Sequence, residues 1–159
     1  MPIMPDFRYY LRVRYGECDA QKVVFNARWG DYVDVAMGEF LRTLGYGAEL
    51  ASGELDFQLV KQTTEWRAPA RFDDVLEATV RAGRLGNTSV ILLTGFRISG
   101  KPDLIVTVET VYVLVDASLS KRALPDELRE RLQRGAPDCV VDHAGHVRSE
   151  RPESAGCGR

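Results

Sequence analysis

Cysteine and histidine are scarce in this chain, and long apolar runs are missing. Three cysteines stand among 159 residues. Their odd number and wide spacing argue against a disulfide framework and suit a reducing compartment. No stretch approaches the roughly 20 apolar residues of a transmembrane helix, and the N-terminus lacks the basic and apolar regions of a signal peptide. We therefore expect a cytoplasmic protein without a membrane partner.

Neither positive nor negative charge dominates the chain. Lysine and arginine together number 21 against 23 aspartates and glutamates, so the formal net charge is −2. A nearly balanced chain has no overall field that attracts DNA, RNA or an anionic membrane. We expect no nucleic-acid partner, and a polyanionic ligand would have to be held by local groups.

Metal ligands are few as well. Both histidines, His143 and His146, lie near the C-terminus with Cys139 and Cys157 on either side of them. Their spacing does not match that of a structural zinc site, and the surrounding segment has no periodic pattern. No metal site is expected.

The length of the chain predicts one domain with one core. Apolar residues recur every three or four positions between Ala27 and Gly45, which predicts an amphipathic helix of about five turns. Asn26 is expected to cap this helix with its side chain, and Gly45 to end it. A second, short helix should begin at Pro125 and end at Gly135.

The remaining periodic segments predict strands, because apolar and polar residues alternate in them or because β-branched and aromatic residues dominate. The predicted strands are Phe7 to Tyr15, Phe57 to Arg67, Val75 to Arg84, Ser89 to Ile98 and Leu104 to Asp116. Short turns between the last four predict antiparallel pairing. Residues 1–134 should form the domain, and residues 135–159, rich in Pro, Gly, Ser and charges, a poorly ordered tail.

The last predicted strand carries apolar residues on both faces. One helix cannot cover every strand of a sheet, so the edge or outer face of this strand is expected to meet a second subunit. A homodimer is the minimum expectation.

A cluster of acidic residues surrounds the start of the long predicted helix. Asp19 precedes it, and Asp31 and Asp34 lie within it. The first N–H groups of a helix have no internal partner and carry partial positive charge, so they can polarise a carbonyl oxygen as an oxyanion hole does. A carboxylate beside them could attack that carbonyl or take a proton from water. Neither role requires a metal, a histidine or a cofactor.

Simpler interpretations of these residues stay open. Acids near the first turn of a helix commonly complement its dipole, which could be the whole role of Asp19 and Asp31. Asp34 could lie on a solvated stripe, and Cys18 has no histidine near it in sequence and is most simply a passive thiol.

Two stretches carry a resemblance to a known family. The stretch YGECDAQKVVFNARW, from Tyr15 to Trp29, followed by Tyr32-Val-Asp34, resembles the signature of the 4-hydroxybenzoyl-CoA thioesterase family of hotdog-fold acyl-CoA thioesterases. The later stretch WRAPARFDD, from Trp66 to Asp74, is also similar, and so is the closing segment from Val115 to Pro125. The resemblance covers roughly Phe7 to Leu132.

The resemblance implies an α+β hotdog fold, in which an antiparallel five-stranded sheet wraps around one long helix. It implies dimers, often paired into tetramers, and hydrolysis of an acyl-CoA thioester to a free acid and CoA without a cofactor. By resemblance, Asp19 is the nucleophile or general base and the backbone amide of Asn26 polarises the carbonyl. Phe25, Trp29 and Asp34 match positions that contact the substrate.

One position departs from the family pattern. Lys22 stands where the family usually has glycine, so either the loop has a different conformation or the lysine replaces a turn contact. Lys22 could also meet a CoA phosphate, as could Arg67, Arg71 and Arg84, and the spacing does not choose among them.

Other functions were weighed against hydrolysis of acyl-CoA. A thioesterase acting on an acyl-carrier protein and a noncatalytic acyl-binding hotdog protein remain as alternatives. A hotdog hydratase or dehydratase uses a histidine with a carboxylate, and the absence of histidine before His143 counts against it.

Overall fold

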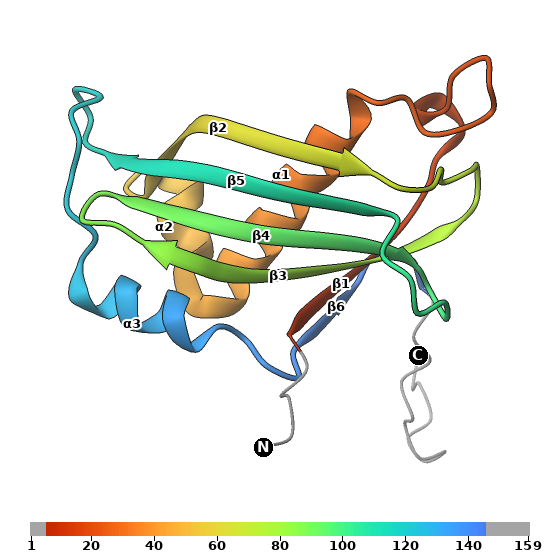
Figure 1. Ribbon diagram of the computed structural model, residues 1–159. Coiled ribbons are helices and arrows are strands. Elements are labelled where there is room, and N and C mark those ends of the chain that lie inside the picture. Colours follow the sequence, from red (N-terminus) through yellow and green to blue (C-terminus); the bar gives the residue numbers. More distant parts are fainter. Residues whose placement is uncertain (1–5, 146–159) are drawn as a thin grey trace, which may run out of the picture.

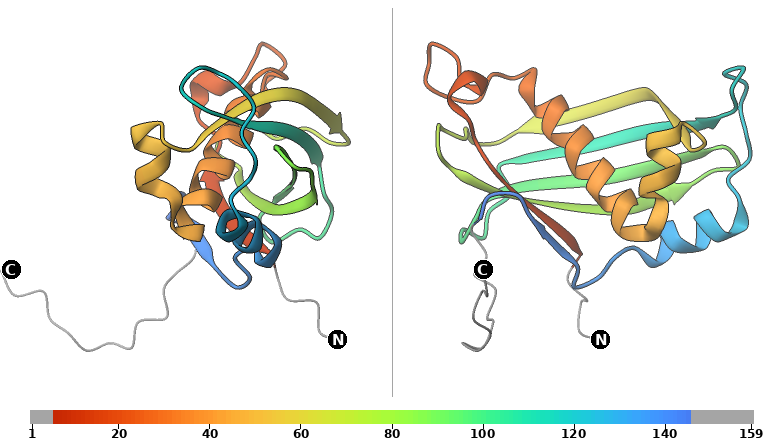
Figure 2. Two further views of the ribbon diagram at one scale, coloured as in Figure 1. Left: turned by 90° about the vertical axis from the view of Figure 1, so that its left-hand side faces the viewer. Right: turned by 180° about the vertical axis from the view of Figure 1, so that it is seen from behind.

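The computed structural model describes residues 6–145, and the predicted segments around His146 and Cys157 lie outside them. One curved sheet wraps around one helix, as Figure 1 shows from the front and Figure 2 from the side and behind. The elements in chain order are β1 (Phe7–Arg12), a 3₁₀ turn η1 (Tyr15–Glu17), α1 (Arg28–Leu41), a π-helical turn η2 (Arg42–Tyr46), α2 (Gly47–Ser52), β2 (Asp56–Trp66), β3 (Val75–Leu85), β4 (Ser89–Ile98), β5 (Val106–Val115), α3 (Asp126–Arg134) and β6 (Val140–Asp142). Among the described residues, no helix is long and apolar enough to cross a bilayer.

The predicted hotdog architecture is confirmed. The sheet has the order β2-β5-β4-β3-β1-β6, and every pairing among β1 to β5 is antiparallel. Helix α1 lies across one face of this sheet (Figure 2, right). The core forms between them because the apolar stripe of α1 faces the inward residues of the strands, and Phe40 packs against Phe7 with ring centroids 5.6 Å apart.

A sixth strand adds to the five that the sequence predicts. Strand β6 pairs in parallel with β1, and the N–H of Arg8 donates a hydrogen bond to the Cys139 carbonyl (3.0 Å). It comes from the first part of the segment predicted as a poorly ordered tail. The segment Val140–Asp142 is too short to show a clear alternation of apolar and polar residues. Its pairing depends on β1, which lies more than 130 positions away in the chain.

Two predictions about the long helix need correction. Asn26 does not cap it with its side chain: α1 begins at Arg28, and Ala27 at the cap position already has helical angles. The first turn is closed instead by backbone carbonyls, since the N–H of Arg28 donates to Phe25 O (2.8 Å). Gly45 does not end the helical segment but bends it between α1 and α2, with φ of 98°. A Cβ there would lie 2.7 Å from Arg131 Nη1, so the close approach of Arg131 also requires glycine.

The prediction that the last strand has a free edge is wrong, whereas contact of its outer face with a second subunit stays a prediction. Strand β5 lies between β2 and β4, and β2 forms the open edge of the sheet (Figure 1). On β2, Leu59 and Val60 are 52% and 59% exposed, and the register shifts between Leu59 and Lys61. One face of β5 is buried in the core, whereas Val111 and Val113 on the opposite face are only partly buried.

Candidate active site

Asp19 lies in a tight turn that precedes α1. Its N–H donates to Val23 O (2.9 Å), and the N–H of Lys22 donates back to Asp19 O (2.9 Å). The carboxylate oxygen Oδ1 of Asp19 accepts the N–H of Gln21 (2.8 Å). No described residue donates to Oδ2, so one carboxylate oxygen is free for chemistry.

Lys22 keeps the backbone conformation that favours glycine. Its φ is 63°, in the left-handed region, so the loop has the turn of a glycine residue with a lysine in place. The backbone of Lys22 also makes a turn contact, because its N–H donates to Asp19 O (2.9 Å).

The start of α1 offers unpaired backbone donors. The N–H of Phe25 is used by Glu17 O (2.9 Å), and the N–H groups of Arg28 and Trp29 are used inside the first turn. No residue in the described part of the chain accepts a hydrogen bond from the N–H of Asn26 or Ala27. These two groups stand at the positive end of the helix dipole, where an oxyanion is stabilised.

A pocket of about 260 Å³ opens at this helix start. Its walls come from the loop before α1, from the end of β2 and from the loop after it. The lining residues are Val23, Val24, Asn26, Trp29, Trp66, Arg67, Ala68 and Pro69. The N–H of Val24 donates to Ala70 O (2.8 Å), which holds the two loops side by side.

The predicted site residues fall into two groups. Asn26 and Trp29 line the pocket, although Trp29 is mainly a core residue whose ring packs on Phe96 with centroids 5.1 Å apart. Asp19 and Phe25 lie outside the lining, one in the turn that leads to Val23 and the other half-exposed beside Asn26. The pocket therefore brings Asn26 together with an aromatic wall, and the carboxylate of Asp19 lies in the adjoining turn.

Asp34 lies about two turns further along α1, away from this pocket and at the surface. Partial burial raises the pKa of its carboxyl, and the charge of Asp31 adds to the effect. The pKa of Tyr112 on β5 is raised to about 12, chiefly by burial and further by the charge of Asp34.

Of the arginines considered for the CoA phosphates, Arg67 alone lines the pocket, where it forms an ion pair with Glu65 (3.7 Å). Arg71 follows on the same loop, and its backbone N–H donates to Asp74 Oδ2 (2.8 Å). Arg84 lies near the opposite end of β3.

Glu17 lies two positions before Asp19 and has no role predicted from the sequence. Its carboxylate is buried, and it accepts hydrogen bonds from the Tyr32 hydroxyl and from the Arg14 guanidinium and N–H. Burial by itself raises the pKa of this carboxyl, but the bonds from Tyr32 and Arg14 outweigh it, and the pKa is lowered. The signal in the sequence was an acid two positions before Asp19 together with a tyrosine on the apolar stripe of the helix.

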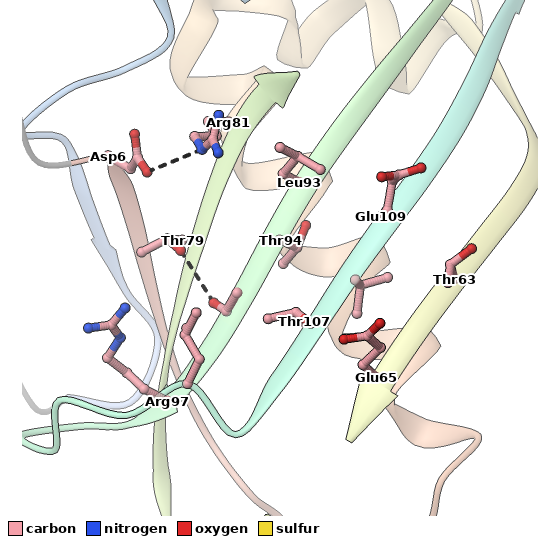
Figure 3. A pocket seen from close by; sticks show the side chains of 13 residues that line it. Asp6, Thr63, Glu65, Thr79, Arg81, Leu93, Thr94, Arg97, Thr107 and Glu109 are labelled. Atoms are coloured by element: carbon pink, nitrogen blue, oxygen red, sulfur yellow. Dashed lines mark hydrogen bonds and ion pairs between the residues drawn. The ribbon is translucent and has the colours of Figure 1, made fainter. Parts of the chain in front are cut away.

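A larger cavity, of about 460 Å³, lies on the face of the sheet that α1 does not cover (Figure 3). It contains none of the predicted site residues. Its polar groups pair with one another: Arg81 contacts Asp6 (3.9 Å), and the Thr79 hydroxyl donates to Gly95 O (3.4 Å). Within residues 6–145, no group of three or more metal-ligating side chains is found.

Comparisons with known proteins place the chain in a family. Residues 13–132 match the Thioesterase-like superfamily. The acyl-CoA thioester hydrolase YbgC of Escherichia coli O157:H7 is 32% identical over 124 residues, which cover 77% of this chain and 92% of YbgC. The structure of a gentisyl-coenzyme A thioesterase is similar with a TM-score of 0.72 and 26% identity, covering 79% of this chain and 98% of that one.

A 1,4-dihydroxy-2-naphthoyl-CoA thioesterase from Synechocystis shares the fold, with a TM-score of 0.71 at 17% identity over 79% of this chain and 94% of that one. The predicted thioester-hydrolase family is confirmed by a match that spans three quarters of the chain. The protein is a hotdog-fold member of the Thioesterase-like superfamily.

Proposed function

We propose that the protein hydrolyses an acyl-CoA thioester to a free acid and CoA in the cytoplasm. The single observation that carries this proposal is the pair of unused N–H groups at Asn26 and Ala27, beside a turn that holds the free oxygen of Asp19. A thioester carbonyl bound over the start of α1 would receive hydrogen bonds from these groups as its oxygen gains negative charge.

Asp19 acts on the carbonyl carbon in one of two ways. As a general base it takes a proton from water, the hydroxyl adds to the carbonyl carbon, and the C–S bond breaks as the thiolate of CoA leaves. As a nucleophile it forms an anhydride with release of the thiolate, and water then hydrolyses the anhydride. Both routes give the same products and need no metal.

The remaining predicted residues have roles in binding. Trp29 forms an apolar wall of the pocket, the half-exposed Phe25 contacts the substrate from outside the lining, and Asp34 contacts a more distant part of the acyl group. Arg67 lines the pocket, and its proposed role is to bind a phosphate of CoA.

The test is thiol release from short-chain, long-chain and aromatic acyl-CoAs, with Asp19→Asn measured beside the parental protein. We expect Asp19→Asn to keep its fold and to lose at least about 100-fold in kcat, because an amide neither attacks nor accepts the proton. Asp31→Asn is the matched control, since Asp31 is exposed and pairs only with Arg28 (3.3 Å). Hydrolysis by Asp19→Asn at the parental rate would refute the mechanism.

The same assay distinguishes the two alternative functions. Turnover of acyl-carrier-protein thioesters alone would identify the carrier protein as the substrate. Binding of acyl-CoA without thiol release would identify a noncatalytic acyl-binding protein.

We also propose that two copies pair along β2, with pairs associating further into tetramers. Support comes from the exposed Leu59 and Val60 on the open edge and from Trp66, half-exposed beside the pocket, which a second copy would cover. Val60 is one of the apolar residues that this contact would bury, and burying a lysine ammonium in its place without a partner is costly. Val60→Lys should therefore sediment as a monomer at concentrations where the parental protein does not, and a parental protein that sediments as a monomer would refute the assembly.

A further inference from the structure

The carboxylate of Glu17 is buried near the proposed catalytic turn and accepts three hydrogen bonds. Its residue is only 7% exposed, whereas the side chain of its partner Arg14 is 85% exposed. Burying a carboxylate is costly unless donors replace the lost water. Three donors do so here: the Arg14 guanidinium, the Arg14 N–H (3.2 Å to Oε2) and the Tyr32 hydroxyl.

The backbone of Glu17 stands at the base of the turn that carries Asp19. Its carbonyl accepts the N–H of Phe25 (2.9 Å), and the next residue, Cys18, forms a bridge with Val24. The two ends of the turn from Asp19 to Val23 are therefore held together by the contacts of Glu17 with Phe25 and of Cys18 with Val24. A shift of Glu17 would move the whole turn.

Tyr32 connects this base to the helix. It lies on α1 about one turn after the helix start, and it is buried. Its ring packs edge-on against Trp29 with centroids 5.4 Å apart, and Trp29 lines the pocket at Asn26. The bond from Tyr32 to Glu17 thus joins the element that holds the carboxylate to the element that holds the unused N–H groups.

We propose that Glu17 is a positioning residue, which acts through Tyr32 to hold Asp19 at the reacting distance from a carbonyl bound at Asn26 and Ala27. This inference rests on the proposed function. Glu17 contacts no substrate in it. Catalysis depends on the relative placement of the two elements, and a displacement of about 1 Å can cost about 100-fold in rate.

The test separates positioning from simple stabilisation. Glu17→Gln loses the charge that Arg14 pairs with, and Tyr32→Phe loses one donor and keeps the ring. Each should lower kcat by about 10-fold to 100-fold and leave KM within about twofold, because the pocket that binds the substrate is unchanged. Glu39→Gln is the control. Like Glu17, Glu39 is a largely buried acid paired with an arginine, Arg42 (3.5 Å), but it lies on α1 and remote from the turn.

The decisive measurement repeats Glu17→Gln in the Asp19→Asn background. If Glu17 acts through Asp19, the residual rate of the double variant equals that of Asp19→Asn alone. A residue that only stabilises the fold would lower the rate by the same factor in both backgrounds, or only as far as the folded fraction falls, and either result would overturn the inference. If Glu17→Gln does not fold, the same comparison is made with Tyr32→Phe.

Failure of the inference is distinct from failure of the proposed function. Loss of turnover in Asp19→Asn with parental kcat in both Glu17→Gln and Tyr32→Phe refutes only the positioning role. Parental turnover in Asp19→Asn refutes the function on which it rests.

Discussion

The N–H of Lys22 donates a hydrogen bond to the carbonyl of Asp19 (2.9 Å) in a turn where Lys22 itself has φ of 63°. The turn that presents the proposed catalytic carboxylate therefore contains a residue in a conformation that non-glycine residues rarely adopt. The left-handed conformation costs about 1–2 kcal/mol for a residue with a Cβ.

Lys22→Gly should relieve this cost. Glycine also has more freedom to lose on folding, so we expect a net change in the free energy of unfolding between zero and about 1 kcal/mol in favour of the variant. Lys22→Val should destabilise, because a β-branched side chain is worse in this region. Urea unfolding of the three proteins measures this, and a glycine variant that is less stable than the parental protein by more than about 1 kcal/mol would contradict it.

Two buried tyrosines should respond differently to loss of their hydroxyl. Tyr32 donates to the buried Glu17 carboxylate, so Tyr32→Phe should destabilise by about 1.5–3 kcal/mol. The Tyr112 hydroxyl is buried without a hydrogen-bond partner among the described residues, so Tyr112→Phe should be neutral or stabilise by up to about 1 kcal/mol. Urea unfolding of both variants measures the change in the free energy of unfolding. Equal destabilisation by the two substitutions would contradict this explanation from hydrogen bonding.

Acid should weaken the fold through Glu17. Hydrogen bonds lower its pKa in the folded state despite burial, so its contribution to stability is complete above its ordinary pKa of about 4.3. That contribution is lost as the pH falls through the lowered value, because the unfolded state then binds more protons. The difference in urea midpoint between the parental protein and Glu17→Gln should therefore shrink from pH 7 to pH 3, and a constant difference would contradict the assignment.

Strand β6 should contribute to the stability of the domain. It covers the edge of β1, where the N–H of His143 donates to Tyr10 O (2.9 Å) and the His143 ring bonds the Tyr9 hydroxyl (3.0 Å). A chain that ends at Gly135 should unfold at lower temperature by several degrees and aggregate more readily, because an open strand edge pairs with other chains. A chain that ends at Gly145 keeps β6 and is the control, and equal melting of the two would refute the role of the strand.

Local patterns sufficed for most of the fold. Alternation in the segment from Phe7, the periodicity after Ala27 and the turns between the later strands predict the antiparallel sheet and its helix, because side-chain period and turn chemistry act over a few residues. Leu128 and Leu132 likewise anchor α3 as their spacing indicates. The motif around Asp19 and Asn26 predicts a site at the start of α1, and Asn26 lines a pocket there.

The sequence by itself thus determined the five antiparallel strands, the long helix and the short helix near the C-terminus, and it identified the residues suited to the proposed chemistry. The tertiary structure decided which strand is the open edge, that β6 covers the other edge, and that Glu17 meets Tyr32 beside the turn of Asp19. It also separated Asp34 from the pocket at Asn26. These relationships join residues far apart in the chain or depend on how the sheet curves around α1, and a local pattern contains no information about the partner that such a contact requires.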